Sequence, residues 1–215
     1  MNTVTDPSSA SPQILVLASQ SPRRAALLQQ LGYEPVCCPV PIDETPNQDE
    51  SPKELVLRLA TEKAWASYHL GVLPDETSGN RVIVAADTVI DLHGKTLGKP
   101  CDERDAIEML LLLSDKEHLV HTGVCIVADS VESQHALCVS TKVQFAKITT
   151  AQAKRYWLSG EPADKAGAYA IQGLGSQFVV KISGSYSGVV GLPLYETSRI
   201  LSELGVGAVE KIERA

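Results

Sequence analysis

Residues 81–92, RVIVAADTVIDL, constrain the fold most, because apolar residues follow one another almost without interruption. A strand with one face in water alternates apolar and polar residues, so this run is too continuous for a half-exposed strand. One carboxylate, Asp87, interrupts the run, and burying it is unfavourable unless it is paired, hydrogen-bonded or bound to a metal. Asp87 is therefore a candidate functional residue, and the alternative is a structural aspartate that caps a turn with Thr88.

Strand-like and helix-like segments alternate along the chain. We predict strands at 14–18, 33–39, 81–92 and 177–182, a β-hairpin at 118–128 and 136–147, and helices at 21–32, 51–71, 101–115, 149–160 and 192–205. Loops are predicted at 40–50 and 73–80, a turn at 93–95 and a disordered tail at 1–13. This alternation predicts an α/β fold, and the hairpin makes its sheet a mixed one with flanking helices. Residues 14–215 are interpreted as a single domain.

Composition excludes several classes of protein. The chain is 44% hydrophobic and 21% charged, as expected for a soluble globular protein, and no apolar run approaches the length of a membrane span. Its N-terminus lacks the features of a secretory signal. A net charge of −7 opposes binding to nucleic acid unless a local basic patch exists. Five scattered cysteines without metal-ligand spacing indicate thiols in a reducing cytosol, and hence a cytoplasmic protein.

Two arginines lie where a helix least favours them. Ser21 is a suitable N-cap and Pro22 a suitable first helical residue, so Arg23 and Arg24 fall in the first turn, where the helix dipole disfavours cations. A helix N-terminus that follows a strand is an anion site, and guanidinium groups bind phosphate through paired hydrogen bonds. Phosphate binding would therefore explain the pair, and the alternative is that both side chains bend into solvent or pair with nearby acids.

Three further charged residues strengthen the phosphate hypothesis. Lys63 lies four residues after Leu59 on the apolar face of the predicted helix 51–71, so it either extends to the surface or points into a cleft. Glu44 follows a predicted strand in a proline-rich loop, and Lys99 lies in LGKP, although either alone is more often a solvated surface charge. Together with Arg23 and Asp87 they suit a triphosphate with a hard divalent cation, Mg²⁺ or Mn²⁺.

Seven motifs in order then identify a resemblance. LASQSPRR, VPIDE, RLATEKA, VAADTVI, GKP, HTGV and DKAGAYAIQG are similar to those of the Maf-type nucleoside triphosphate pyrophosphatases, over about residues 14–205. The resemblance implies a fold like that of inosine triphosphate pyrophosphatase, with two lobes around a central cleft. It also implies metal-dependent cleavage between the α and β phosphates, giving a nucleoside monophosphate and pyrophosphate.

The resemblance assigns roles to individual residues. Asp87 would accept the proton of the attacking water, and Glu44 would act with it at the metal. The phosphates would be held by Ser19, Arg23, Lys63 and Lys99. The segment GAYAIQGLG resembles the branch that acts on dTTP and UTP, in which Arg23, Thr88 and Gln172 match positions used for base selection. Glycines 167, 173 and 175 would let the backbone approach a flat base, or would only mark turns.

Two other functions remain open. One is a non-catalytic nucleotide-binding regulator of cell division, because the family is associated with septum formation. The other is a pyrophosphatase that removes modified pyrimidine nucleotides. The predicted partner is a nucleoside triphosphate, with no nucleic acid and no membrane, and the sequence leaves open whether the chain forms a homodimer.

Overall fold

The computed structural model describes residues 13–70, 81–128 and 130–208. The predicted tail at 1–13, apart from Gln13, and the predicted loop at 73–80 lie outside these residues. Within the described part of the chain, no helix is both long and apolar enough to cross a membrane.

A seven-stranded mixed sheet forms the centre of the molecule. Its strands are β1 (Ile14–Leu17), β2 (Val36–Cys37), β3 (Arg81–Leu92), β4 (Lys95–Leu97), β5 (Glu117–Ala128), β6 (Ser130–Phe145) and β7 (Val179–Ser183). The order is β2-β1-β3-β5-β6-β7, and β4 pairs with the last residues of β3. β1 runs parallel to β2 and β3, whereas the remaining pairs are antiparallel. The predicted mixed sheet and embedded hairpin are confirmed.

Helices flank the sheet as predicted. They are α1 (Pro22–Gln30), α2 (Pro52–Leu70), α3 (Glu103–Leu113), α4 (Thr150–Trp157), α5 (Tyr186–Val190) and α6 (Leu194–Glu203), with 3₁₀ turns η2 (Glu161–Asp164), η3 (Ala166–Ala168) and η4 (Leu174–Phe178). A capping box begins α2: the Ser51 hydroxyl accepts from the Glu54 N–H, and Glu54 accepts from the Ser51 N–H at 2.9 Å. At α1, Ser21 occupies the N-cap position but its side chain makes no capping bond.

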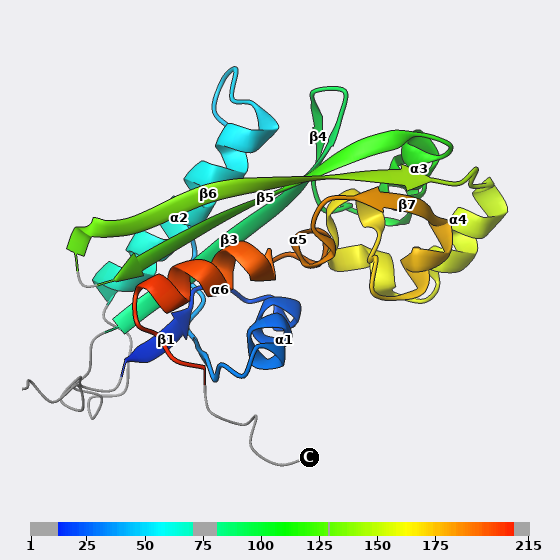
Figure 1. The fold of residues 1–215 in the computed structure, drawn as a ribbon. Coiled ribbons are helices and arrows are strands. Elements are labelled where there is room, and N and C mark those ends of the chain that lie inside the picture. Colours follow the sequence, from blue (N-terminus) through cyan, green and yellow to red (C-terminus); the bar gives the residue numbers. More distant parts are fainter. Residues whose placement is uncertain (1–12, 71–80, 129, 209–215) are drawn as a thin grey trace, which may run out of the picture.

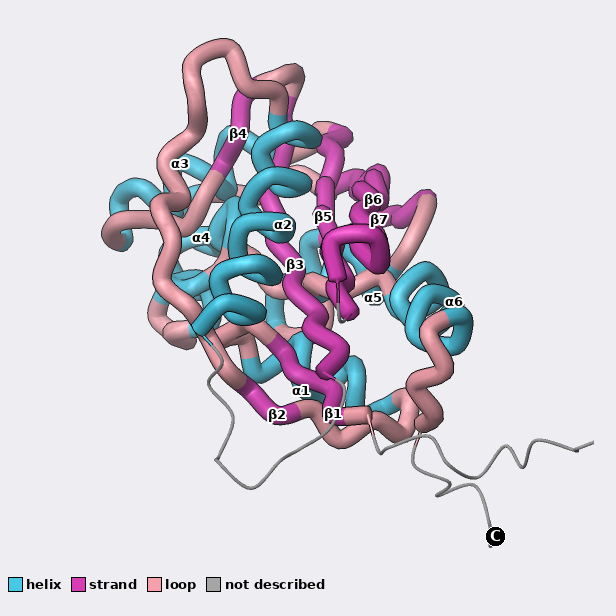
Figure 2. The backbone as a smooth tube through the Cα atoms, turned by 90° about the vertical axis from the view of Figure 1, so that its left-hand side faces the viewer, coloured by secondary structure: helices cyan, strands magenta, loops and turns pink. Residues whose placement is uncertain are grey.

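The alternation of side chains along β3 divides one part of the core into two layers. Val82, Val84 and Ala86 pack with α1 and α6, whereas Ile83 and Ala85 pack with α2. Figure 2 shows α2 and α6 on opposite sides of β3 and β5. Both faces of the strand are therefore covered, which explains its continuous apolar sequence.

A second core lies towards the other end of the long strands. Ile90 and Leu92 of β3 pack there with α3, α4 and residues from β5 and β6. Figure 1 shows β3, β5 and β6 running from α1, α2 and α6 to α3 and α4. The predicted α/β fold is confirmed, and its two cores share these three strands.

Close packing of α2 on β5 depends on one glycine. A Cβ atom at Gly123 would lie 2.2 Å from the backbone oxygen of Val56. This distance is too short for any residue with a side chain. The glycine of the HTGV motif thus allows the helix backbone to approach the strand, and it fixes the height of α2 above the sheet.

Three elements differ from the prediction. The strand predicted at 33–39 is only Val36–Cys37, because it pairs with β1 at two positions and lies between Pro35 and Pro39, which cannot donate to a ladder. β4 is three residues long and pairs only with the end of β3, and the turn predicted at 93–95 overlaps it at Lys95 alone. α5 has five residues including Gly188, too few for a periodic apolar pattern.

Candidate active site

A cavity of about 820 Å³ opens beside β3, where β1 ends and β3 continues. Its walls come from the regions of both cores. All eight side chains singled out from the sequence line it: Ser19, Arg23, Glu44, Lys63, Asp87, Thr88, Lys99 and Gln172. The structure therefore places these residues at one site, although they come from seven separate points of the chain.

A lysine joins two carboxylates on the α2 side of this cavity. Asp87 follows Ile83 and Ala85 on the face of β3 that α2 covers, and Lys63 extends from α2 towards it. The Lys63 ammonium lies 2.7 Å from Asp87 Oδ1 and 2.6 Å from Glu44 Oε1. The Lys63 and Asp87 side chains are only 11% and 12% exposed, so the lysine does not extend to the surface.

Glu44 is held ionised by its surroundings. Burial alone would raise the pKa of this carboxyl group, but the hydrogen bond from Lys63 and the charges of Lys63, Lys99 and Arg24 outweigh it and lower the pKa. Because both carboxylates contact the same ammonium, their oxygens converge on one point of the cavity.

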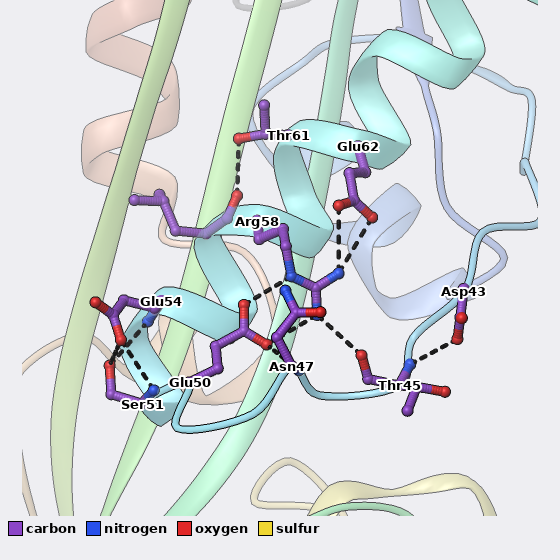
Figure 3. A network of polar contacts seen from close by, with 10 residues as sticks. Asp43, Thr45, Asn47, Glu50, Ser51, Glu54, Arg58, Thr61 and Glu62 are labelled. Atoms are coloured by element: carbon purple, nitrogen blue, oxygen red, sulfur yellow. Dashed lines mark hydrogen bonds and ion pairs between the residues drawn. The ribbon is translucent and has the colours of Figure 1, made fainter.

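The loop that carries Glu44 is fixed to α2 by Arg58, as Figure 3 shows. The Arg58 guanidinium forms paired bonds with Glu50, at 2.6 and 2.9 Å, and donates to the Thr45 carbonyl at 3.0 Å. Glu62 accepts from the same group at 3.3 Å. Since Thr45 is the neighbour of Glu44, this network holds the backbone beside the carboxylate in place.

Arg24 enters the cavity more deeply than Arg23, a difference that the sequence analysis did not identify. Its guanidinium donates to the Gly191 carbonyl at 2.8 Å, the Ser19 hydroxyl at 3.0 Å and the Thr88 hydroxyl at 3.3 Å. No carboxylate of the described residues forms an ion pair with it, and burial lowers its pKa while the charge of Asp87 opposes that shift. A half-buried guanidinium held by neutral oxygens leaves positive charge for an anion.

One signal could have distinguished the two arginines. Leu27 and Leu28 are the buried residues of α1, and Arg24 precedes them by three and four positions. It therefore shares a face with both leucines, whereas Arg23 aligns with Leu27 alone.

A chain of hydroxyl groups fixes Thr88. The Thr122 hydroxyl donates its proton to the Gly188 carbonyl at 2.8 Å. The Thr88 and Thr122 hydroxyl oxygens lie 3.0 Å apart, so the hydrogen bond between them uses the proton of Thr88. Thr88 in turn accepts from Arg24. Its proton is thus used inside the protein, and Thr88 offers the cavity only an acceptor.

Ser19 differs from Thr88 in this respect. Its hydroxyl oxygen accepts from the Ser21 N–H at 3.1 Å and from Arg24. The hydroxyl proton is therefore still available to a ligand in the cavity.

The other cations stand nearer to solvent. Arg23 lies 3.4 Å from Asp164 of η2, an exposed acid, which is the pairing that the sequence analysis kept as an alternative. Lys99 is exposed and has no ion pair within the described residues. Gln172 is also exposed at the cavity. These three side chains are free, or held by one contact, where a ligand would enter.

Three glycines expected near the base face the protein instead. A Cβ atom at Gly167 would lie 2.4 Å from Ile90, one at Gly173 2.1 Å from Glu161, and one at Gly175 2.6 Å from the Tyr156 hydroxyl. None of them is among the residues that line the cavity. Their small size therefore serves packing inside the second core region.

Comparison with known proteins identifies the family. The family described as Maf-like protein matches residues 14–204. The chain belongs to this family. Its conserved fold agrees with the mixed α/β architecture described above.

Several curated members of the Maf family are similar over nearly their full length. A protein from Pseudoalteromonas atlantica named dTTP/UTP pyrophosphatase is 48% identical over 194 residues, 90% of this chain and 98% of its own. Proteins of the same name from Vibrio vulnificus and Colwellia psychrerythraea are 49% and 45% identical, over 88% and 94% of this chain and 97% and 94% of theirs.

Proposed function

We propose that this protein hydrolyses dTTP and UTP to the nucleoside monophosphate and pyrophosphate. The name of its relatives supports this substrate class. The observation that carries the proposal is the joint presence, in one cavity, of a half-buried guanidinium without a carboxylate partner among the described residues and of two carboxylates on one lysine. Such a cavity combines a place for a polyphosphate with groups able to activate water.

The phosphates would lie between Arg24 and the cations at the rim of the cavity. Arg24 is preorganised by its neutral partners, so its positive charge needs no rearrangement to meet an anion. Arg23 and Lys99 would add charge from the rim, Arg23 by exchanging Asp164 for a phosphate oxygen. Ser19 would donate its free hydroxyl proton.

A divalent cation fits the donor set at Glu44 and Asp87. Within the described residues no group of three or more histidine, cysteine, aspartate or glutamate side chains is arranged to hold a metal. Two converging carboxylates are nevertheless the protein ligands that Mg²⁺ or Mn²⁺ takes when phosphate oxygens and water complete the shell. When bound, such a cation supplies charge stabilisation at phosphorus and lowers the pKa of water.

Asp87 would accept the proton in the chemical step. A water oxygen would form a bond to the α-phosphorus while the bond from that phosphorus to the bridging oxygen breaks, leaving its electron pair on pyrophosphate. The water proton would pass to the Asp87 carboxylate. Lys63 would hold Asp87 and Glu44 in place through its contacts with both carboxylates.

Base selection would belong to the exposed Gln172, because an amide can donate to O4 and accept from N3–H of uracil or thymine. The residue lines the same cavity as the phosphate-binding groups, which makes simultaneous contact with base and phosphates feasible.

The five cysteines, which all lie within the described residues, form no disulfide with one another, which is consistent with a reducing compartment, and we propose the cytoplasm.

Pyrophosphate release tests the proposal. The purified protein with Mg²⁺ or Mn²⁺ is expected to release pyrophosphate from dTTP and UTP faster than from modified pyrimidine triphosphates and 7-methyl-GTP. Asp87→Ala is expected to abolish release with its circular dichroism spectrum unchanged, whereas Asp115→Asn, at a turn remote from the cavity lining, serves as control. A wild-type protein that cleaves none of these nucleotides would refute the proposal. Nucleotide binding without cleavage would instead favour the regulatory function.

A further inference from the structure

The loop that carries Gln172 is held from behind by two side chains. Glu161 of η2 accepts from the Leu174 N–H and the Gly175 N–H, both at 2.9 Å. Tyr156 of α4 accepts from the Ala170 N–H at 3.1 Å and donates its own hydroxyl to Glu161 at 2.5 Å. These two side chains, the Tyr156–Glu161 clamp, therefore bind backbone groups on both sides of Gln172.

The clamp is built to keep one protonation state. Burial raises the pKa of the Tyr156 hydroxyl, and the hydrogen bond to Glu161 raises it further. For Glu161, burial acts to raise the pKa, but the bonds from Tyr156, Gly175 and Leu174 outweigh it and the pKa falls. The phenol keeps its proton and the carboxylate stays ionised, which makes each contact to the carboxylate a charge-assisted hydrogen bond.

The loop sequence is shaped to the clamp. Any side chain at Gly173 would collide with the Glu161 carboxylate, and one at Gly175 would collide with the Tyr156 hydroxyl. Glycine at both positions lets the backbone lie directly against the two side chains. Gln172, between these anchored points, extends in the other direction to the cavity and is exposed there.

We propose that Tyr156 and Glu161 are positioning residues that set base selectivity by holding Gln172. The inference rests on the proposed function, since it concerns which base that site accepts. The N3–O4 edge of uracil must reach the amide while the triphosphate reaches the cations, and the larger ring system of a purine places its edge at another distance from the phosphates. A fixed loop holds the amide at one distance from the phosphate-binding groups, so the wrong base leaves polar groups unpaired. A loose loop accepts both.

Selectivity between UTP and GTP tests the clamp. Glu161→Gln keeps the shape of the side chain but directs an amide N–H₂ at a backbone N–H. We expect the ratio of kcat/KM for UTP over GTP to fall about tenfold, the equivalent of about 1.4 kcal/mol. Tyr156→Phe removes one of the three backbone contacts and is expected to lower the ratio about threefold. The control is Glu203→Gln, which removes an exposed carboxylate at the end of α6 and is expected to leave the ratio unchanged.

A merely structural role gives a different result. It would lower thermal stability and reduce kcat/KM for both nucleotides by the same factor, and an unchanged ratio in Glu161→Gln would overturn the proposal. Hydrogen exchange gives a second readout: the amides of Leu174 and Gly175 are expected to exchange faster in Glu161→Gln, with those of α3 unchanged.

Failure of the proposed function is recognised separately. If the wild-type protein cleaves neither nucleotide, the proposed reaction is wrong, and the ratio of dissociation constants for UTP and GTP replaces the kinetic ratio. Equal ratios for wild type and Glu161→Gln in that measurement would also overturn the role of the clamp.

Discussion

Arg24 and Arg23 are neighbours in α1, yet their guanidinium groups meet different surroundings. Arg24 satisfies three oxygen acceptors inside the cavity, whereas Arg23 makes one contact, with the exposed Asp164. We expect Arg24→Lys to lower kcat/KM for UTP about 100-fold, because an ammonium keeps the charge but cannot hold the planar set of bonds. Steady-state kinetics of Arg23→Lys give the comparison, with a smaller loss expected. Equal losses would show that charge alone matters.

His118 provides a prediction about pH. It is buried, its Nε2 bonds to the Tyr169 hydroxyl at 2.9 Å, and its Nδ1 has no partner among the described residues. Burial lowers the pKa of His118 to about 4. The unfolded chain, with an ordinary histidine pKa of about 6.5, therefore binds a proton before the folded protein does. The contribution of neutral His118 to the free energy of unfolding is complete above about pH 6.5. It is lost as the pH decreases towards 4, and the loss is at most about 3 kcal/mol.

Urea unfolding at pH 7.5 and pH 4.5 measures this loss. His118→Gln is expected to lose much less stability between the two pH values than the wild type does. His135→Gln, at a half-buried position of β6, is the control and is expected to keep the wild-type difference. If His118→Gln retained the full difference, other groups would be responsible for it.

The chemistry of single residues made much of the candidate site visible in the sequence. A carboxylate in an apolar strand and a lysine on an apolar helix face are each costly alone, and the structure places them 2.7 Å apart. Arg24 escaped notice because two adjacent arginines differ only in which way the helix turns them. Tyr156 and Glu161 escaped because backbone groups are their partners, and these leave no pattern in the sequence.

Elements with strong local signals were predicted closely. β3 has the predicted bounds, 81–92, because its twelve residues are covered on both faces, and α2 begins where its capping box begins. β4, α5 and the 3₁₀ turns were missed, since three to five residues carry no periodicity and their existence depends on distant partners.

The loop between β2 and α2 yields a prediction at this scale. Arg58 binds Glu50 and the Thr45 carbonyl, so it fixes the loop that carries the Glu44 carboxylate (Figure 3). We expect Arg58→Ala to raise the Mg²⁺ concentration needed for half-maximal pyrophosphate release about tenfold, with a smaller change in the maximal rate. Titration of Mg²⁺ at saturating UTP measures both quantities.

Arg104→Ala is the matched control for this titration. Arg104 also pairs with a glutamate four residues along its helix, but it is 86% exposed and lies on α3, outside the cavity lining. It is expected to leave the Mg²⁺ dependence unchanged. A normal Mg²⁺ dependence in Arg58→Ala would show that the loop keeps Glu44 in place without the arginine.

At the scale of the whole molecule, the cavity takes its residues from both core regions. Arg24 and Lys63 belong to helices of the first core, whereas Gln172 and Asp164 belong to the segment that packs with the second. Arg23 and Asp164 connect the two regions across the cavity. Relative movement of the cores would therefore pull the site apart, and the three long strands that run through both oppose such movement.

Shared strands predict that the two cores unfold together. The chain has two tryptophans, Trp65 of α2 beside the first core and Trp157 of α4 beside the second, so Trp65→Phe and Trp157→Phe each leave one fluorescent reporter. In each variant, the remaining tryptophan is expected to show a single transition, and its urea midpoint is expected to equal the midpoint that circular dichroism gives for the same variant. Adding Leu28→Ala in the first core, or Leu110→Ala in the second, is expected to cost about 2–5 kcal/mol and to shift either reporter equally. A leucine variant that moved only the tryptophan of its own core would show that the strands do not couple the two halves.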